Sequence, residues 1–225
     1  MRVSQARVFV ADSTLVTSEC RDRLKRVPAS MRRRLSSYSK LIVTAIIELA
    51  EREEGIHNIP VVLATRHGDL HRTEKLLRTL VQGEVLSPTQ FGLSVNNAVL
   101  GQYSMAVGNQ QAMTTVSGGE ETYPLGWLEA IAQVSNEFGQ VLLVVADETP
   151  PEVYKKQQDS PIHAFAQAVL LDRNNGREVI LDQSGESAKN DDAYEVVEKL
   201  QHCLEQGHQS LAVNYGSKAW SWHVD

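Results

Sequence analysis

Short, continuously apolar segments constrain the fold of this chain most strongly. Val141–Ala146 (VLLVVA) and Pro60–Ala64 (PVVLA) are too brief for buried helices. Such runs are typical of strands that are buried on both faces of a sheet. Longer segments with apolar residues at three- and four-residue steps separate them and predict helices. We therefore expect one α/β domain over residues 1–225, with helices layered on both faces of a mixed, mostly parallel sheet.

The remaining segments extend this alternation. Pro28, followed by apolar residues at helical spacing up to Gly55, predicts one long helix, and Ser87 with Pro88 begins a second helix that runs to Val99. A hairpin is expected around the turn Asn174–Gly176, because two strand-like runs flank it. The other expected elements are strands over Arg7–Ala11, Ala112–Ser117, Ala164–Asp172 and Glu178–Asp182, helices over His71–Leu80, Leu125–Phe138 and Ala193–Leu204, and a polar connection over Ser184–Asp192.

Composition excludes several classes of partner. The formal net charge is −6, so neither nucleic acid nor an anionic membrane is expected to bind. One basic cluster, Arg32, Arg33 and Arg34 continuing to Lys40, interrupts the acidic balance. It is either the solvated face of a helix or a docking site for an acidic partner protein.

The cysteines and the N-terminus indicate the compartment. Cys20 and Cys203 are far apart and fit no metal spacing, and the histidines form no metal-ligand or triad spacing, so neither a metal nor a cofactor is predicted. Two free thiols suit a reducing compartment. Met1–Val10 shows no signal peptide, and no window approaches the roughly 20 apolar residues that span a bilayer. We expect a soluble, cytoplasmic protein.

The segment from Met113 to Ile131 reads as a strand, a tight turn and a helix. That geometry presents one residue at a helix N-terminus, where unpaired N–H groups can stabilise an anion. Ser117 is one candidate nucleophile, although G-x-S-x-G lacks its first glycine here. Glu120 and Glu121 are candidate acids, and they would also fit as first-turn carboxylates that complement the helix dipole.

Three segments carry a family resemblance. Leu86–Met105, containing SPTQFGLSVNNA, resembles the region before the active-site strand of β-ketoacyl synthases. Thr65–Asp69 is similar to a loop after an earlier strand of that family, and Pro28–Leu41, with MRRRLSSYSKL, resembles the N-terminal helix of small stand-alone members. The match runs from about Arg7 to Val145, with a looser fit beyond. The resemblance implies a thiolase-like half, equivalent to the N-terminal domain of a ketosynthase.

The sequence departs from that pattern at the nucleophile. Gly126–Ala130 resembles the helix after the catalytic cysteine, which puts Glu120 at the cysteine position, or Glu121 or Gly119 if the register slips by one. Neither cysteine is near this segment, so thiolate attack on an acyl thioester has no candidate. The second half of an active ketosynthase, which supplies two catalytic histidines, is also missing. No catalytic residue of the family is therefore expected.

The resemblance implies a chain length factor-like role. Such non-catalytic members pair with an active β-ketoacyl synthase, share its dimer interface and help to shape the acyl pocket, while acyl carrier protein binds transiently. The expected product class is polyketide-like or fatty-acid-like, as in bacterial aryl polyene clusters. The expected interface is Ala112, Met113, Thr114, Thr115 and Val116, and the acyl-tunnel candidates are Tyr103, Met105, Met113 and Trp127, which could equally pack in a core.

Two alternatives remain open. The chain could be a true acyl-thioester enzyme, a decarboxylase or hydrolase that uses Glu120 or Ser117. It could also be a scaffold that binds a carrier protein without a ketosynthase.

Overall fold

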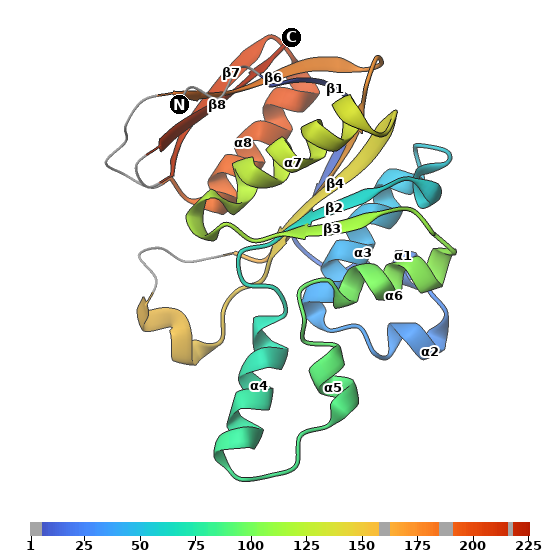
Figure 1. Ribbon diagram of the computed structural model, residues 1–225, viewed down its shortest axis with the longest axis vertical. Coiled ribbons are helices and arrows are strands. Elements are labelled where there is room, and N and C mark those ends of the chain that lie inside the picture. Colours follow the sequence, from blue (N-terminus) through green and yellow to red (C-terminus); the bar gives the residue numbers. More distant parts are fainter. Residues whose placement is uncertain (1–5, 158–162, 185–190, 216–217) are drawn as a thin grey trace.

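A computed structural model describes residues 6–157, 163–184, 191–215 and 218–225. One eight-stranded sheet in the order β3-β2-β4-β5-β1-β6-β8-β7 runs through the molecule (Figure 1). The strands are β1 (Ala6–Val16), β2 (Val61–Ala64), β3 (Met113–Val116), β4 (Gln140–Asp147), β5 (Phe165–Asp172), β6 (Arg177–Ser184), β7 (Gln209–Tyr215) and β8 (Lys218–Val224). The two apolar runs of the sequence form β2 and β4, as predicted, and these paired strands are second and third in the sheet order.

Helices cover both faces of the sheet. On one face lies α3 (Ser37–Ala50), preceded by the short helices α1 (Arg21–Leu24) and α2 (Ala29–Arg32). On the other face lie α7 (Thr122–Asn136) and α8 (Ala193–Gln206) (Figure 1). The layered α/β/α architecture with a mixed sheet is therefore confirmed. Between β2 and β3 the chain forms α4 (Leu70–Val81), α5 (Pro88–Gly92) and α6 (Ala98–Val107).

The expectation of a mostly parallel sheet is wrong in detail. Only β3-β2 and β2-β4 are parallel, whereas the other five pairings are antiparallel. Parallel neighbours need a crossover, which α4–α6 and α7 supply between β2, β3 and β4. The consecutive strands β4 and β5, and β7 and β8, pair antiparallel, and β1 pairs antiparallel with both β5 and β6. The strands β7 and β8 were missed in the sequence.

The predicted hairpin around Asn174–Gly176 is also wrong. The two strands β5 and β6 do not pair with each other, because β1 lies between them and pairs with both. Gly176 has a φ of +112°, and a Cβ there would collide with the Val10 carbonyl of β1. The turn therefore crosses directly over β1, and it requires glycine for that reason.

Two predicted helices are each divided. Ser36 interrupts the long helix and caps α3, because its side chain accepts a hydrogen bond of 3.1 Å from the Ser39 amide. The helix from Ser87 to Val99 is split into α5 and α6 by the segment around Asn96. Most of the predicted connection Ser184–Asp192 lies outside the described residues.

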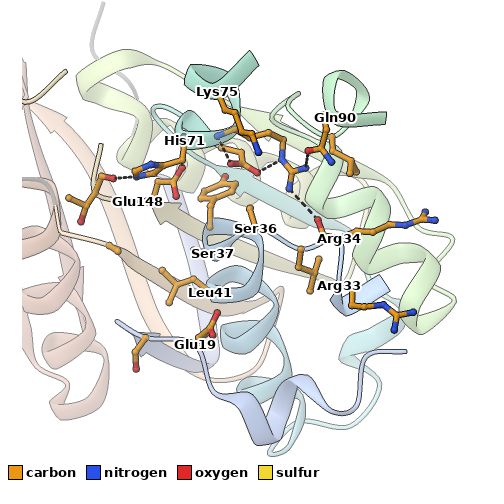
Figure 2. A pocket seen from close by; sticks show the side chains of 18 of the residues that line it. Glu19, Arg33, Arg34, Ser36, Ser37, Leu41, His71, Lys75, Gln90 and Glu148 are labelled. Atoms are coloured by element: carbon orange, nitrogen blue, oxygen red, sulfur yellow. Dashed lines mark hydrogen bonds and ion pairs between the residues drawn. The ribbon is translucent and has the colours of Figure 1, made fainter. Parts of the chain in front are cut away.

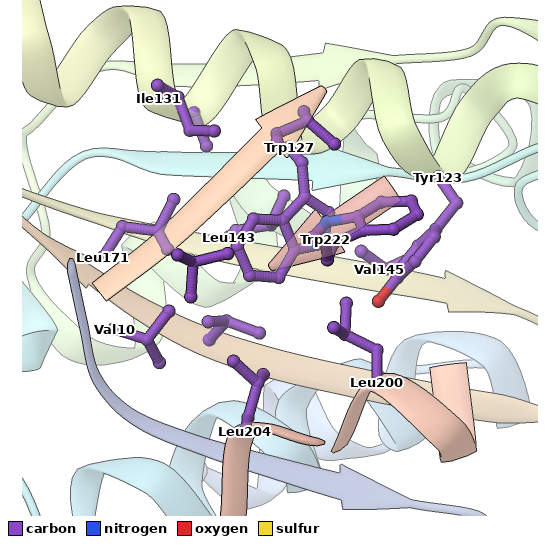
Figure 3. Close-up of a cluster of buried hydrophobic side chains, with 14 of the residues drawn as sticks. Val10, Tyr123, Trp127, Ile131, Leu143, Val145, Leu171, Leu200, Leu204 and Trp222 are labelled. Atoms are coloured by element: carbon purple, nitrogen blue, oxygen red, sulfur yellow. The ribbon is translucent and has the colours of Figure 1, made fainter. Parts of the chain in front are cut away.

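The core has two parts, one on each face of the sheet. Trp127 of α7 packs edge-on against Trp222 of β8, with ring centroids 6.3 Å apart, and Tyr123 joins them (Figure 3). On the opposite face, ten residues of α3 are buried against the sheet, which explains why this helix is apolar nearly all round.

Candidate functional site: the turn after β3 and its surroundings

The turn after β3 has the strand–turn–helix geometry that the sequence predicted. The strand ends at Val116, a 3₁₀ turn covers Gly119–Glu121, and α7 begins at Thr122. Gly119 has a φ of +62°, which favours glycine. The Thr122 hydroxyl accepts a hydrogen bond from the Gly118 amide (2.9 Å) and donates one to the Gly119 carbonyl (2.7 Å). The turn is thus tightly closed on itself at the start of α7.

Ser117 acts as a structural link in this geometry. Its hydroxyl donates a hydrogen bond of 2.6 Å to the Thr65 carbonyl, at the end of β2. It accepts one of 3.1 Å from the Asn96 side chain, which lies between α5 and α6. A serine nucleophile must give its proton to a base, whereas this proton faces a carbonyl oxygen. The contacts connect the ends of β2 and β3 to the helical excursion.

The two glutamates of the turn are oriented differently. Glu120 is exposed, and its carboxylate lies 3.9 Å from the Arg66 guanidinium. Glu121 forms a closer ion pair, 3.0 Å long, with Lys218 of β8. Cys20 precedes α1 and Cys203 lies buried in α8, so the described thiols belong to other elements. The turn before α7 thus presents Glu120 as an exposed carboxylate.

A buried carboxylate beside the turn was missed in the sequence. Asp147, at the end of β4, accepts hydrogen bonds from the Thr65 hydroxyl (3.2 Å) and from the amides of Arg66 (3.1 Å) and His67 (3.1 Å). Burial raises the pKa of Asp147 to about 6, although these hydrogen bonds oppose the shift. The sequence feature that could have revealed this residue is its position directly after the apolar run Val141–Ala146. Asp147 holds the loop that leads from β2 into α4.

A cavity of about 900 Å³ lies between the start of α3, α4, α5 and the end of β4 (Figure 2). Its buried lining includes Tyr38, Leu41, Asp69 and Glu148. Burial raises the pKa of Glu148, while a hydrogen bond from the His71 amide opposes this. Burial also raises the pKa of Tyr38. The buried wall of the cavity therefore combines apolar and acidic side chains.

Basic residues surround the opening of this cavity. Arg33 and Arg34 lie on one side of it, opposite His71 and Glu148, and Lys75 lies on α4 (Figure 2). In the described parts of the chain these three cations, Arg33, Arg34 and Lys75, form no ion pair. The predicted basic cluster is divided, because Arg32 donates a hydrogen bond to the Leu24 carbonyl and Lys40 pairs with Glu19 at 3.3 Å.

Strand β3 is an edge strand. Its only sheet neighbour within the described residues is β2. The amides of Val61 and Thr65 donate to the carbonyls of Ala112 and Val116, so the alternate residues Met113 and Thr115 direct their backbone groups outward. The five predicted interface residues thus form one edge of the sheet, where Met113 and Thr115 offer hydrogen-bonding groups to another strand.

The tunnel candidates are not brought together in the free chain. Tyr103 is buried in α6, where its hydroxyl lies 3.0 Å from His57 Nδ1. Trp127 is buried on the opposite face of the sheet, and Met105 is 71% exposed. Met113 is half-buried beside the α3 layer. These four side chains do not line one common cavity.

The described residues contain neither a cluster suited to a metal ion nor a helix suited to crossing a membrane. No group of three or more His, Cys, Asp or Glu residues there could hold a metal ion. No helix in the same residues is long and apolar enough to cross a membrane.

The sheet, its helix layers and the turn before α7 define a thiolase-like, ketosynthase-type domain. The chain belongs to the family described as Beta-ketoacyl synthase, N-terminal domain, whose model matches residues 6–223. This confirms the resemblance seen in the sequence. No curated protein matches the chain by sequence.

Solved structures with the same fold include ketosynthase assemblies. A chain of "Ketosynthase (ApeO) in Complex with its Chain Length Factor (ApeC) from Xenorhabdus doucetiae" is 23% identical, with a TM-score of 0.81 and coverage of 96% of this chain and 98% of that one. A chain of the ishigamide ketosynthase/chain length factor is 13% identical, with a TM-score of 0.59 and coverage of 73% of this chain and 53% of that one. A chain of the AntDE:AntF complex, a type II PKS acyl-carrier protein with its ketosynthase, is 11% identical, with a TM-score of 0.56 and coverage of 76% of this chain and 59% of that one. This chain thus spans just over half of the latter two matched chains.

Proposed function

We propose that this chain is a non-catalytic, chain length factor-like subunit that pairs with an active β-ketoacyl-acyl carrier protein synthase. In the pair it would shape the acyl pocket during polyketide-like or fatty-acid-like elongation, including aryl polyene products. The observation that carries the proposal is the occupant of the turn before α7. Glu120 lies there, exposed and 3.9 Å from Arg66, and we assign it to the position where the family resemblance implies a thiol.

The edge of the sheet supports a partner of the same fold. Met113 and Thr115 direct unpaired backbone groups outward, and an unpaired edge favours pairing with another strand. Length supports the same assignment, since the match of near-equal length comes from a complex of a ketosynthase with its chain length factor. In contrast, this chain covers only 53% and 59% of the matched chains from the other two assemblies.

Transient binding of acyl carrier protein is proposed at the basic opening of the cavity. Arg33, Arg34 and Lys75 supply positive charge there without a neutralising ion pair among the described residues. Such a patch would attract an acidic carrier, and its effect should weaken with salt. Of the tunnel candidates, Met105 is exposed and could contact an acyl chain after assembly. We place the complex in the cytoplasm.

Co-expression with a ketosynthase encoded beside this chain tests the proposal. A stable 1:1 complex by size-exclusion chromatography with light scattering is expected. Thr115→Pro should weaken it, because it removes an outward N–H from β3 without touching the bonds to β2. Thr115→Val is the matched control, since it keeps the N–H. Elution of two separate species with the wild-type chain would contradict the proposal.

The enzymatic alternatives are tested in the same complex. Glu120→Ala should leave ketosynthase turnover largely intact, and Ser117→Ala should do the same if the fold persists. Loss of turnover in an assembled Glu120→Ala complex would assign the carboxylate a chemical role. Release of carbon dioxide or free acid from malonyl- or acyl-carrier protein by the isolated chain would instead support a decarboxylase or hydrolase.

A further inference from the structure

The helical excursion between β2 and β3 exposes an apolar surface that no other described residue covers. We call residues 70–95, which comprise α4, α5 and their connections, the hairpin. It projects from the molecule at the end away from β7 and β8 (Figure 1). Among the described residues, most of the exposed large apolar side chains belong to it. They are Leu77 (47% exposed), Leu80 (58%), Val81 (88%), Val85 (95%), Phe91 (61%) and Val95 (48%).

Helix α4 is held to its own chain mainly by polar contacts near its N-terminus, where Asp69 caps it and His71 and Arg72 form hydrogen bonds. It has 12 residues, and none of them is buried. Leu77, Leu80 and Val81 are three and four positions apart, so they lie on one face of the helix. An isolated helix of about 12 residues is only marginally stable in water. The apolar face is therefore suited to burial against another molecule.

The position of the hairpin indicates which molecule covers it. Asn96, the residue directly after the hairpin, donates a hydrogen bond to Ser117, which follows β3 and itself donates to Thr65. The hairpin and β3 are thus tied together at the same end of the sheet (Figure 1). A subunit that pairs with the outer edge of β3 lies next to the hairpin. Buried apolar area there would add affinity that strand pairing alone does not supply.

We infer that the hairpin is a second contact arm, whose face formed by Leu77, Leu80 and Val81 packs against an apolar surface of the ketosynthase subunit paired with β3. This inference rests on the proposed function. In the complex the exposed face of α4 would be buried, so local opening of this helix should become rarer.

A titration of the co-expressed ketosynthase with purified variants tests the inference. Leu80→Ser combined with Val81→Ser is expected to weaken binding by about tenfold or more. Val153→Ser is the matched control, because Val153 is 53% exposed and lies outside the hairpin. Circular dichroism of the free variants verifies that they fold. Unchanged affinity of the double variant, with the wild-type chain still bound, overturns the arm while leaving the proposed function intact.

Two further measurements separate the remaining outcomes. Hydrogen exchange is expected to be fast for α4 amides in the free chain and slow in the complex, whereas equal protection in both overturns the inference. Light scattering of the wild-type chain alone is expected to give a monomer. A homodimer that the double variant dissociates would assign the arm to a second copy and overturn the ketosynthase as its occupant. Failure of the wild-type chain to bind any ketosynthase overturns both proposals.

Discussion

Helices α3 and α4 show how differently two helical patterns are used in one chain. Ten of the 14 residues of α3 are buried, whereas none of the 12 residues of α4 is. The free energy that orders α3 comes from the sheet of the same molecule, because apolar burial dominates folding. The apolar face of α4 has no counterpart in the described residues. Burial of α3 therefore stabilises the fold of this chain, whereas the exposed apolar face of α4 is available for contact with a partner subunit.

The largest effect is expected in α3. Ile46→Ala removes a side chain with no exposed area from the core between α3 and the sheet. We expect the free energy of unfolding to fall by about 3 kcal/mol, measured by urea denaturation. A loss under about 1 kcal/mol would mean that α3 is packed more loosely than its burial indicates, and the contrast with α4 would weaken.

A pH effect is expected where the sheet anchors the loop leading to α4. Because the pKa of Asp147 is raised to about 6, above its unfolded value, the folded state binds a proton more tightly there. Its contribution to stability is fully present below the unfolded pKa and is lost as pH rises through about 6. Relative to Asp147→Asn, the wild-type chain should lose on the order of 2 kcal/mol between pH 4 and pH 7.

Denaturation of both proteins across that pH range measures the difference. Glu148, whose pKa burial also raises, is common to both proteins and cancels to first order. Parallel stability curves for the two proteins would show that Asp147 does not titrate in this range.

A smaller effect is expected at the start of α3. Ser36→Ala removes the side-chain oxygen that caps the helix. The expected loss is about 1 kcal/mol in the free energy of unfolding. Ser37→Ala serves as the control, because Ser37 is an exposed neighbour that does not cap α3. If the two substitutions had equal effects, the Ser36 cap would not explain why the long predicted helix is divided.

The smallest effect is expected in α4. Leu80→Ser should change the stability of the free chain by no more than about 0.5 kcal/mol, because Leu80 is 58% exposed. Thermal melts of the free chain provide the measurement. A loss above about 2 kcal/mol would show that α4 packs on its own chain, and the comparison between the two helices would fail.

Strong apolar patterns made the centre of the fold predictable. The strands β2 and β4 and the strand–turn–helix around Gly119 follow from short-range patterns that the structure satisfies. The order of β5, β1 and β6 did not follow, because the pairing of β1 depends on contacts between segments far apart in the sequence. The split at Ser36 was visible only as a possible cap inside a continuous helical pattern.

The candidate site was predictable only in part. Glu120 and Ser117 were located correctly on the turn, but the hydrogen bond from Ser117 to the Thr65 carbonyl joins residues 52 positions apart. Asp147 was missed because an acid after an apolar strand does not reveal whether it turns inward or toward water. The cavity under Arg33 and Arg34 depends on how segments far apart in the sequence pack together, which no local pattern encodes.

The placement of the indole rings has a practical consequence for spectroscopy. Trp127, Trp220 and Trp222 are the three tryptophans of the chain, and all are buried in the cluster shared by α7, α8 and β8. Intrinsic fluorescence should therefore report loosening of that face alone. A tryptophan introduced at Val85, which is 95% exposed, would give a separate signal from the opposite end of the molecule.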